Sequence, residues 1–399
     1  MHGRLGCRKV PGCANALIKV TVNDAISDIP ENEWDALLDD DTPFLRHAFL
    51  QAAEHSGSAA PETGWIPRHL TLYKGDELRA AMPLYEKNHS WGEFVFDWAW
   101  AQAYERAGLE YYPKLVSAIP FTPATSARLL LRDAGDTDAA SALVRAAIQL
   151  ADDTDCSSLH ILFPNELDLR ICKNLDLKIR KDCQFHWHNQ DYKNFDEFLM
   201  TFSAPKRKKV RQDRRRVADA GITFRRIRGG EMDDVTWRLA YQLISITFMR
   251  RGSMPYFDLD FFKTISTQLP DNVLVIFAEQ NSKAIAAAVF YESNDTLYGR
   301  YWGSDGHYDA LHFDTCYYQG IEYCIESGKN KFEPGTQGEH KVARGFTPVQ
   351  TSSAHWLRHP EFFAAIGAYV DEEAQHVERY MQAVDEHSPY RDNTEEESS

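Results

Sequence analysis

Alternation of apolar and polar residues predicts one hairpin in each half of the chain. Two pairs of runs alternate with a period of two, and each pair flanks a polar turn: residues 68–73 and 77–85 around 74–76, and residues 273–278 and 284–291 around 280–282. This period is typical of half-buried strands, and Gly, Asn, Asp or Ser between two such runs indicates a turn. We therefore predict an antiparallel strand pair in each half.

The elements around each hairpin occur in the same order in both halves. Helices precede the hairpin, and a strand, a helix and a strand follow it: 114–119, 139–150 and 158–163 in the first half, and 296–302, 311–327 and 331–333 in the second. This order predicts two copies of one α/β (α+β) fold, each a mixed twisted sheet flanked by helices. A last helix is predicted over residues 360–386, where apolar residues recur at steps of three and four. Its apolar stripe is expected to pack on the body of the protein, with a dimer seam as the alternative.

The length of 399 residues suits about two domains. We place the boundary near residues 189–194, which gives an N-terminal domain over 17–190 and a C-terminal domain over 191–388. Residues 1–16 lack the apolar core of a signal peptide and are predicted to form a disordered extension. Residues 389–399 are predicted to form an acidic disordered tail.

Composition narrows the classes of function. Seven cysteines without a C-x-x-C pair fit a reducing compartment, and no apolar run is long enough to span a bilayer. We therefore expect a cytoplasmic protein without membrane insertion. The net charge of −15 disfavours a broad nucleic-acid surface. His186 and His188 share a strand face without a third ligand, so no metal site is predicted, and G-x-S-x-G and H-E-x-x-H are both absent.

An aromatic segment, residues 91–108, provides the first candidate site residues. Its pattern predicts a strand with Phe94 and Phe96 on one face, and then a helix from Trp98 to Gly108. Asp97 falls at the N-cap, where its carboxylate would accept backbone hydrogen bonds; alternatively, it faces a ligand. Four further candidates for substrate binding lie nearby, and the last of them is either an anion clamp or a surface charge: Trp98, Tyr104, Tyr112 and Arg128. Lys114 lies at a predicted strand end.

A strongly basic segment, residues 206–216, contains eight basic residues and one acid. It is predicted to be a helix that ends at Gly221 and buries Val210 and Val217. Four arginines share another face, which suits phosphate or RNA because guanidinium offers paired donors: Arg207, Arg211, Arg214 and Arg215. The alternative is a solvated helix face whose charge is offset by the acidic body of the protein.

The segment 295–347 carries the densest set of candidate catalytic residues. Its strand bears Arg300 and Tyr301, and its helix bears His312 and Gln319 on a face apart from the apolar one. Gly320 on the apolar face would allow a neighbour to approach closely. The loop after Glu333 is glycine-rich but lacks the GK[ST] ending of a phosphate-binding loop.

The triplet Glu339, His340 and Lys341 follows that loop. Glu339 or His340 could remove a proton from an attacking amine, and Lys341 or Arg344 could stabilise an oxyanion or a phosphate. The alternative is an exposed polar turn with Arg344 as an ion-pair partner.

Six blocks of this sequence resemble the signature blocks of a known family. These are GEFVFDWAWAQAYERAG, YYPKL with PFTP, FSAPKRKKVRQDRRRV, LYGRYWG, LHFDTCYYQGIEYCIESG and FEPGTQGEHKVARGF, from about Trp91 to Pro348. They resemble the bacterial FemAB-like peptidoglycan biosynthesis/recognition proteins, which are grouped with the GNAT acyltransferases. The resemblance implies tandem GNAT-like domains.

Fem ligases transfer an amino acid from aminoacyl-tRNA to a peptidoglycan precursor. The resemblance places their basic helix at residues 207–216 and their phosphate-contacting lysine at Lys341. Two features depart from the pattern. GSDGHYDA does not match the pyrophosphate motif of GNAT enzymes, which counts against acetyl-CoA, and the net acidity counts against a large tRNA footprint.

The prediction is therefore an N-acyltransferase in which an amine attacks a carbonyl carbon without a covalent enzyme intermediate. Glu339 or His340 would remove the proton, and Lys341 with Arg300 would stabilise charge. The other candidates would bind substrate: Asp97, Trp98, Tyr104, Tyr112, Lys114, Arg128, Tyr301, His312, Gln319 and Arg344. The co-substrate would be acyl-CoA or aminoacyl-tRNA, the acceptor a small molecule, peptide or cell-wall precursor, and no other cofactor is implied. The alternatives are a non-catalytic ligand-recognition protein and an RNA-binding protein that uses residues 206–216; the oligomeric state stays open.

Overall fold

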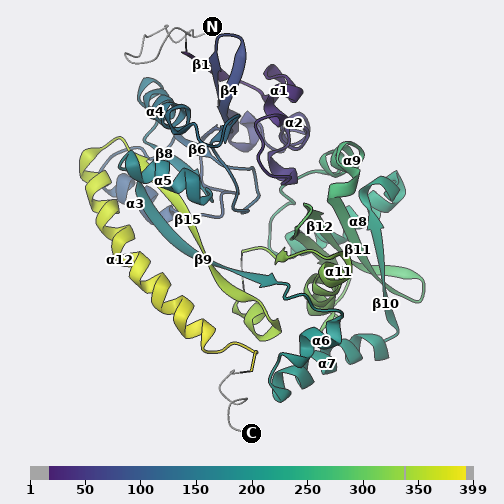
Figure 1. Cartoon of the computed structure of the whole chain (residues 1–399). Coiled ribbons are helices and arrows are strands. Elements are labelled where there is room, and N and C mark those ends of the chain that lie inside the picture. The colour runs from purple at the N-terminus through teal and green to yellow at the C-terminus, as the bar shows by residue number, and fades with distance from the viewer. Residues whose placement is uncertain (1–17, 337, 392–399) are drawn as a thin grey trace. The chain divides into compact units, whose positions relative to one another are not determined.

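The computed structural model describes residues 18–336 and 338–391, and the chain divides into two compact units (Figure 1). The first unit is Met1–Asp182 with Thr351–His376, and the second is Cys183–Gln350 with Val377–Ser399. The chain therefore returns to the first unit near its end, which no shift in composition indicates. The expected N-terminal extension and residues 392–399 of the expected acidic tail lie outside the described residues.

The first unit contains two sheets. One is antiparallel, in the order β1 (Ile18–Asn23), β3 (His69–Lys74), β4 (Glu77–Met82) and β7 (Leu130–Leu131). The other runs in the order β15 (Thr347–Leu357, through residues 353–357), β8 (Ser158–Leu162), β6 (Lys114–Ser117), β5 (Tyr85–Lys87) and β2 (Trp65–Pro67). Strands β3 and β4 form the predicted hairpin, and β6 pairs with β8 in parallel.

The core of the first unit forms where α4 (Thr137–Asp153) packs on β3, β4, β6 and β8. The helix begins after Asp136, whose carboxylate accepts a hydrogen bond from Ala139 N at 3.0 Å. Leu143 and Val144 lie on its apolar face and are fully buried. The remaining helices are α1 (Glu31–Asp35), α2 (His47–His55), α3 (Trp98–Arg106), α5 (Glu166–Asn174) and the first part of α12 (Pro360–Asp385).

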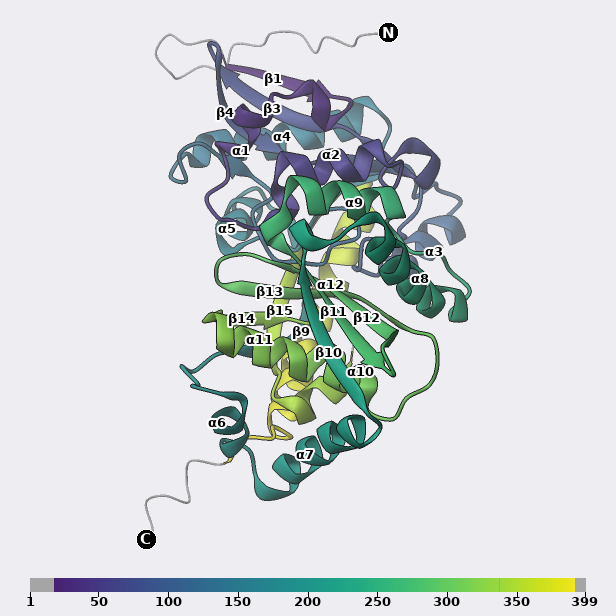
Figure 2. The same cartoon turned by 90° about the vertical axis from the view of Figure 1, so that its right-hand side faces the viewer.

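The second unit is built on one mixed sheet (Figure 2). Its order is β10 (Ile222–Arg228), β11 (Val273–Gln280), β12 (Lys283–Glu292), β13 (Thr296–Ser304), β14 (Lys331–Glu333) and the end of β9 (Lys178–His188). Only β13 and β14 pair in parallel among these strands, and β11 with β12 is the second predicted hairpin. The helices are α6 (Phe195–Met200), α7 (Ala204–Asp219), α8 (Asp234–Arg250), α9 (Leu259–Gln268), α10 (Leu311–Phe313) and α11 (Gln319–Ser327).

Helices cover both faces of this sheet around β13. A Cβ added to Gly303 would lie 1.9 Å from the carbonyl oxygen of Leu243 in α8, so this face contacts α8 directly. The neighbouring residue Trp302 contacts the ring of His312 in α10 at 5.4 Å. Because successive strand residues point to opposite faces, α8 and α10 lie on opposite sides of the sheet.

We expect Gly303→Ala to destabilise the protein by about 3 kcal/mol, the upper end of the usual overpacking effects. The added methyl group would meet backbone atoms of Leu243 and Ile244, which cannot move without shifting α8. Chemical denaturation would measure the loss. Gly306→Ala is the matched control, since its Cβ would meet only the movable side chain of Tyr308, at 3.1 Å. Equal stability of the two variants would contradict this packing.

The predicted helix over 311–327 forms with an irregular turn inside it. Residues Asp314–Tyr318 adopt a π-helical turn between α10 and α11. Such turns add a residue to the helix and change which side chains share a face, and they are frequent at functional sites. Gly320 does permit a close approach, because a Cβ there would lie 2.6 Å from the ring of Phe332.

The predicted strand at residues 91–97 is wrong. This segment is irregular, and Gly92 and Phe94 have φ values of +83° and +60°. Phe94 and Phe96 therefore do not share a strand face, and Phe96 is exposed. The following helix α3 does begin at Trp98, as predicted.

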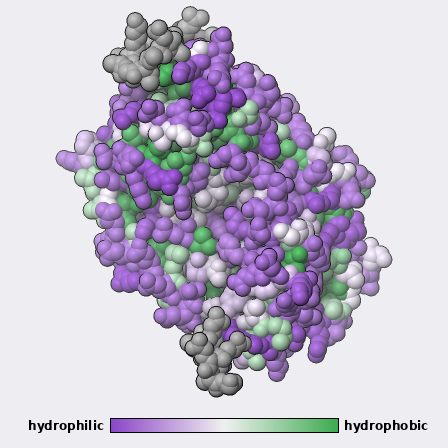
Figure 3. Space-filling view, in the orientation of Figure 1, coloured by the Kyte–Doolittle hydropathy of each residue, from purple (hydrophilic) through white to green (hydrophobic). Residues whose placement is uncertain are grey.

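The visible surface is mostly hydrophilic, with small separate hydrophobic areas (Figure 3). Within residues 18–336 and 338–391, no helix combines the length and the hydrophobicity that crossing a bilayer requires.

Candidate active site

The candidate site is built on the loop that connects β14 to η7 (Glu339–Arg344), a 3₁₀-helical segment. Three glycines in and after this loop have left-handed φ values, +95° at Gly335, +111° at Gly338 and +94° at Gly345. Such values strain residues that have a Cβ. A Cβ at Gly338 would also lie 2.2 Å from the His340 ring. The glycines therefore give the loop its path and leave room for His340.

Lys341 is buried, with 1% of its surface exposed. Its Nζ donates a hydrogen bond to the carbonyl oxygen of Gly335 at 2.6 Å. Within the part of the chain that the structure describes, Lys341 forms no ion pair with a carboxylate. Burial, with the positive charge of Arg300, lowers the pKa of Lys341 to about 7. At neutral pH the residue is therefore balanced between ammonium and amine, and an anion beside it would favour the ammonium.

This shift predicts a pH-dependent stability. The folded pKa of Lys341 lies near 7 and the unfolded value near 10.5, so the unfolded chain binds more protons between these values. Stability should then rise with pH across this window, by about 1.4 kcal/mol per unit from this group alone. Chemical denaturation at pH 7, 8 and 9 would measure the rise. Lys341→Met should show a smaller rise, and equal slopes in the two proteins would contradict the lowered pKa.

His340 lies beside Lys341 and is bonded to the π-helical turn. Its Nε2 is 2.9 Å from the hydroxyl of Tyr317. Burial, then the charges of Arg344 and Lys341, lower the pKa of His340, so the imidazole is neutral at pH 7 and can accept a proton. Sequence reasoning placed Tyr317 on the apolar face of its helix, where its ring is indeed buried in the core, but it did not predict the bond from its hydroxyl to His340.

Arg344 packs behind His340. Its guanidinium carbon lies 3.4 Å from the ring centre of Phe313, and Nη1 donates to the carbonyl oxygen of His340 at 2.5 Å. Nη2 lies 3.7 Å from Asp213 of α7. Arg344 is thus buried and fixed by the protein itself, which makes it a support of the loop.

Arg300 reaches the same loop from β13. It donates to the carbonyl oxygens of Gly299 at 3.1 Å and Glu333 at 3.4 Å, and Nη2 lies 3.8 Å from the Glu333 carboxylate. Burial lowers the pKa of Arg300. Glu333, which sequence reasoning did not select, is therefore the counter-charge at the start of the loop.

Two other predicted residues of the helix lie close by. The His312 ring is 5.4 Å from Tyr317 and 6.2 Å from His340, and burial lowers its pKa to about 4, with help from the charge of His340. Gln319 is buried and donates to Asp314 at 3.2 Å. His312 thus joins the cluster around His340, whereas Gln319 is occupied within the helix.

Glu339 and Tyr301 lie outside this cluster. Glu339 is exposed and accepts a hydrogen bond from Tyr380 at 2.9 Å. Tyr301 is buried among the rings of α8 and α9, with Phe262 at 5.2 Å. The exposed turn considered for the triplet therefore describes Glu339 and His340 but not Lys341.

The predicted residues of the first unit form a separate buried network. Lys114 is fully buried, and its Nζ donates to Ser90 Oγ and Glu93 Oε2, both at 2.8 Å, and to Asp97 Oδ2. Asp97 occupies the N-cap position of α3, but its side chain accepts no backbone amide there. The predicted capping role is wrong, because the carboxylate is bonded to Lys114 and to the Tyr111 hydroxyl, at 2.7 Å.

Burial moves the pKa values of the charged groups in this network away from their ordinary values. Burial raises the pKa of Glu93 to about 7 and lowers that of Lys87 to about 7. Burial opposes the charged form of Asp97, yet the Lys114 ammonium holds the Asp97 pKa below its usual value. Lys87 and Glu93 were not selected from the sequence, where single charged residues in a loop carry no sign of burial.

Arg128 is neither a surface charge nor free to clamp an anion. It is fully buried, and its guanidinium donates to carbonyl oxygens of Ala124, Ser126 and Ala127 between 2.9 and 3.2 Å. Burial lowers its pKa to about 10. The arginine therefore fixes its own loop.

The three aromatic candidates of the first unit differ in their burial and in their contacts. Tyr104 packs in the core, 4.1 Å from Phe362 between ring centres. Trp98 is half-buried against exposed Trp91, and the Tyr112 hydroxyl is 2.9 Å from Ser90 Oγ.

The basic helix α7 is as predicted, and its arginines have different surroundings. Arg214 is paired with Glu322 at 2.9 Å and packs on Phe195. Arg211 lies 3.3 Å from Asp196, and Arg207 donates to a backbone carbonyl. Arg215 is exposed. The solvent-facing charge of the helix is therefore smaller than the sequence suggests.

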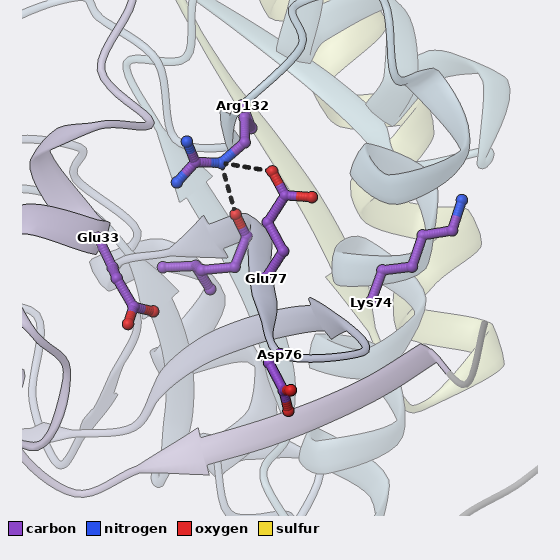
Figure 4. Close-up of a pocket in the computed structure, with 6 residues that line it drawn as sticks. Glu33, Lys74, Asp76, Glu77 and Arg132 are labelled. Carbon is purple, nitrogen blue, oxygen red and sulfur yellow. Dashed lines mark hydrogen bonds and ion pairs between the residues drawn. The ribbon is translucent and has the colours of Figure 1, made fainter.

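A depression of about 520 Å³ lies elsewhere on the first unit (Figure 4). Arg132 lies in it, and its Nε is 2.9 Å from the Leu78 carbonyl oxygen and 3.5 Å from Glu77 (Figure 4). None of the predicted site residues lines it.

Solved structures of similar fold include FemX, with 13% identity, 85% of this chain and 98% of that chain covered, and a TM-score of 0.53. Another is the C-terminal domain of a putative lysylphosphatidylglycerol synthetase from Agrobacterium fabrum, with 11% identity, coverage of 87% and 97%, and a TM-score of 0.54. A tandem GNAT protein from the clavulanic acid pathway aligns with a TM-score of 0.46, 10% identity and coverage of 86% and 99%. A comparison with curated sequences gives no match.

The likenesses to FemX and to the synthetase domain bear on the fold alone, and they agree with the α/β fold that the sequence predicted. The family is established by sequence, because the match of the FemAB-like family, described as peptidoglycan biosynthesis/recognition, covers residues 25–392. The chain belongs to the FemAB-like peptidoglycan biosynthesis/recognition family.

Proposed function

We propose that this protein is an N-acyltransferase of the Fem type, which transfers an aminoacyl or acyl group to the amine of a cell-wall precursor or peptide. The observation that carries the proposal is the buried Lys341 beside a neutral His340 in η7, with Arg344 in the same segment and Arg300 close by. Membership of a peptidoglycan biosynthesis family supports a cell-wall acceptor.

The reaction needs two things from the protein. The attacking amine must lose a proton, and the carbonyl oxygen gains negative charge as the tetrahedral intermediate forms. His340 can accept the proton at neutral pH, with its ring oriented by Tyr317. Lys341 supplies positive charge in a dry environment, where it stabilises an oxyanion or a phosphate far more than in water.

We propose aminoacyl-tRNA, rather than acetyl-CoA, as the donor. The sequence departs from the GNAT pyrophosphate motif at GSDGHYDA, which favours aminoacyl-tRNA over acetyl-CoA. Exposed cations on α7, including Lys208, Lys209 and Arg215, would meet the RNA backbone.

A direct assay tests this function. The protein would be incubated with labelled aminoacyl-tRNAs or labelled acetyl-CoA, each with a UDP-linked muropeptide that carries a free amine. The expected result is label in the muropeptide from one donor class, together with thermal stabilisation by that donor. Absence of transfer from both donor classes, with no stabilisation by either, would contradict the proposal.

A further inference from the structure

We propose that Asp213, a buried carboxylate of α7, is a positioning residue that holds Arg344 in place in η7, at the end of the loop that leads to His340 and Lys341. What this loop does rests on the function proposed above. The connection between α7 and the loop is a separate matter, and it can be tested without any activity.

Asp213 is the point where three segments of the second unit meet. Its side chain is 3% exposed. Oδ2 accepts a hydrogen bond from the Tyr318 hydroxyl at 3.2 Å and lies 3.7 Å from Arg344 Nη2. Oδ1 lies 3.1 Å from Nζ of Lys209, one helical turn earlier. The carboxylate thus joins α7, the π-helical turn and η7.

Arg344 in turn fixes the backbone of His340. Its guanidinium packs on Phe313 and donates to the His340 carbonyl oxygen at 2.5 Å. A guanidinium in this position is held by a ring on one side, a carbonyl and a carboxylate. If the guanidinium moves, the carbonyl of His340 loses its donor, and the ring that Tyr317 orients moves with it.

The Asp213 carboxylate compensates the positive charge of the buried Arg344 guanidinium. Removing one partner of a buried pair leaves an uncompensated charge that costs several kcal/mol. The other buried acid of this region, Asp314, is already bonded to Gln319 and lies 3.8 Å from Arg214. Without Asp213, Arg344 should therefore leave the interior for solvent.

The pKa of His340 shows whether Arg344 leaves the interior when Asp213 is replaced. The Arg344 charge is one cause of the lowered pKa of His340, so Arg344→Gln should raise it. If Asp213 positions Arg344, Asp213→Asn should also raise it, by about half a unit or more. The double variant should show no more than the Arg344→Gln rise. NMR titration of ring-labelled histidines would measure these values, with His340→Gln as the assignment standard.

The sign of the change is decisive. If Arg344 stays in place, removing the Asp213 charge leaves the cation uncompensated, and the pKa of His340 must fall further. A fall, or a rise that persists fully in the Arg344→Gln background, overturns the proposal.

Two matched variants separate positioning from general effects on α7. Asp196→Asn removes an exposed acid paired with Arg211, and Tyr318→Phe removes the hydrogen bond that the Tyr318 hydroxyl donates to Asp213 Oδ2. Both should leave the His340 pKa unchanged, and a rise equal to that of Asp213→Asn in either would contradict a specific role for the Asp213–Arg344 pair.

If Asp213→Asn does not fold, Asp213→Glu takes its place. It keeps the charge but moves the carboxylate by one methylene, and it should raise the pKa of His340 by a smaller amount; an unchanged pKa would overturn the proposal. A protein without transferase activity would remove the proposed function and leave this result standing.

Discussion

Replacing Lys341 by methionine is expected to lower transfer turnover by about 10²- to 10³-fold, the usual loss when one group that stabilises an oxyanion is removed. The Lys341 ammonium is buried and its only hydrogen bond among the described residues goes to the Gly335 carbonyl. The charge is therefore not consumed by a carboxylate of the protein. An amine acceptor and labelled donor, assayed at saturating acceptor, would measure the change in turnover.

The control for this variant is Lys283→Met. Lys283 also lies in the second unit, but its side chain is 73% exposed and is paired with Asp305 at 2.9 Å. Exposed pairs contribute little, so its turnover should stay near that of the original protein. Lys341→Met should remain folded, because methionine fills similar volume and removes a buried charge. Unchanged turnover in a folded Lys341→Met protein would remove Lys341 from the chemistry.

The pH dependence of turnover provides an independent test of the role of Lys341. Lys341 and His340 both have lowered pKa values, so the charged form of Lys341 and the neutral form of His340 coexist only in a limited range near pH 7. A bell-shaped profile is expected, with the basic limb set by Lys341. In Lys341→Met that limb should disappear.

The elements could be predicted because local pattern determines them. Both hairpins and the helix over 360–386 follow from periods of two or of three and four, and the strand at 331–333 and the helix over 206–216 also form as predicted. The strand predicted over residues 91–97 is wrong because an aromatic run resembles a strand in composition. In the structure the backbone there is irregular, with φ +83° at Gly92. Tyr317 lies on the buried apolar face, as predicted, but the π-helical turn at Asp314–Tyr318 and the bond of the Tyr317 hydroxyl to His340 have no sequence sign of their own.

Contacts within the candidate site could be predicted where the residues are neighbours in the chain. His340, Lys341 and Arg344 lie within five residues, and their grouping was visible. Partners distant in sequence, such as Asp213 for Arg344, are set by packing and were not visible. The same limit explains Lys114 and Asp97. The sequence predicts an N-cap or a ligand-facing role for Asp97 and a strand end for Lys114, whereas the two side chains are bonded to each other in the structure.

The buried network of Lys114, Glu93 and Asp97 predicts a large loss of stability when its cation is removed. Lys114→Met should destabilise the protein by about 3–5 kcal/mol, because Glu93 and Asp97 would remain as buried carboxylates without their cation. Chemical denaturation at pH 7 would measure the loss. A loss below about 1 kcal/mol would mean that water or another cation reaches these carboxylates.

The pH dependence of this loss follows from the same charges. Burial already raises the pKa of Glu93 to about 7, and without Lys114 the pKa values of both carboxylates should rise further. Protonation then relieves the unpaired charge, so the loss in Lys114→Met should shrink as pH falls from 7 to 5. Adding Glu93→Gln and Asp97→Asn to Lys114→Met removes the charges together and should recover most of the stability at pH 7. A triple variant as unstable as Lys114→Met would show that side-chain packing, rather than unpaired charge, causes the loss.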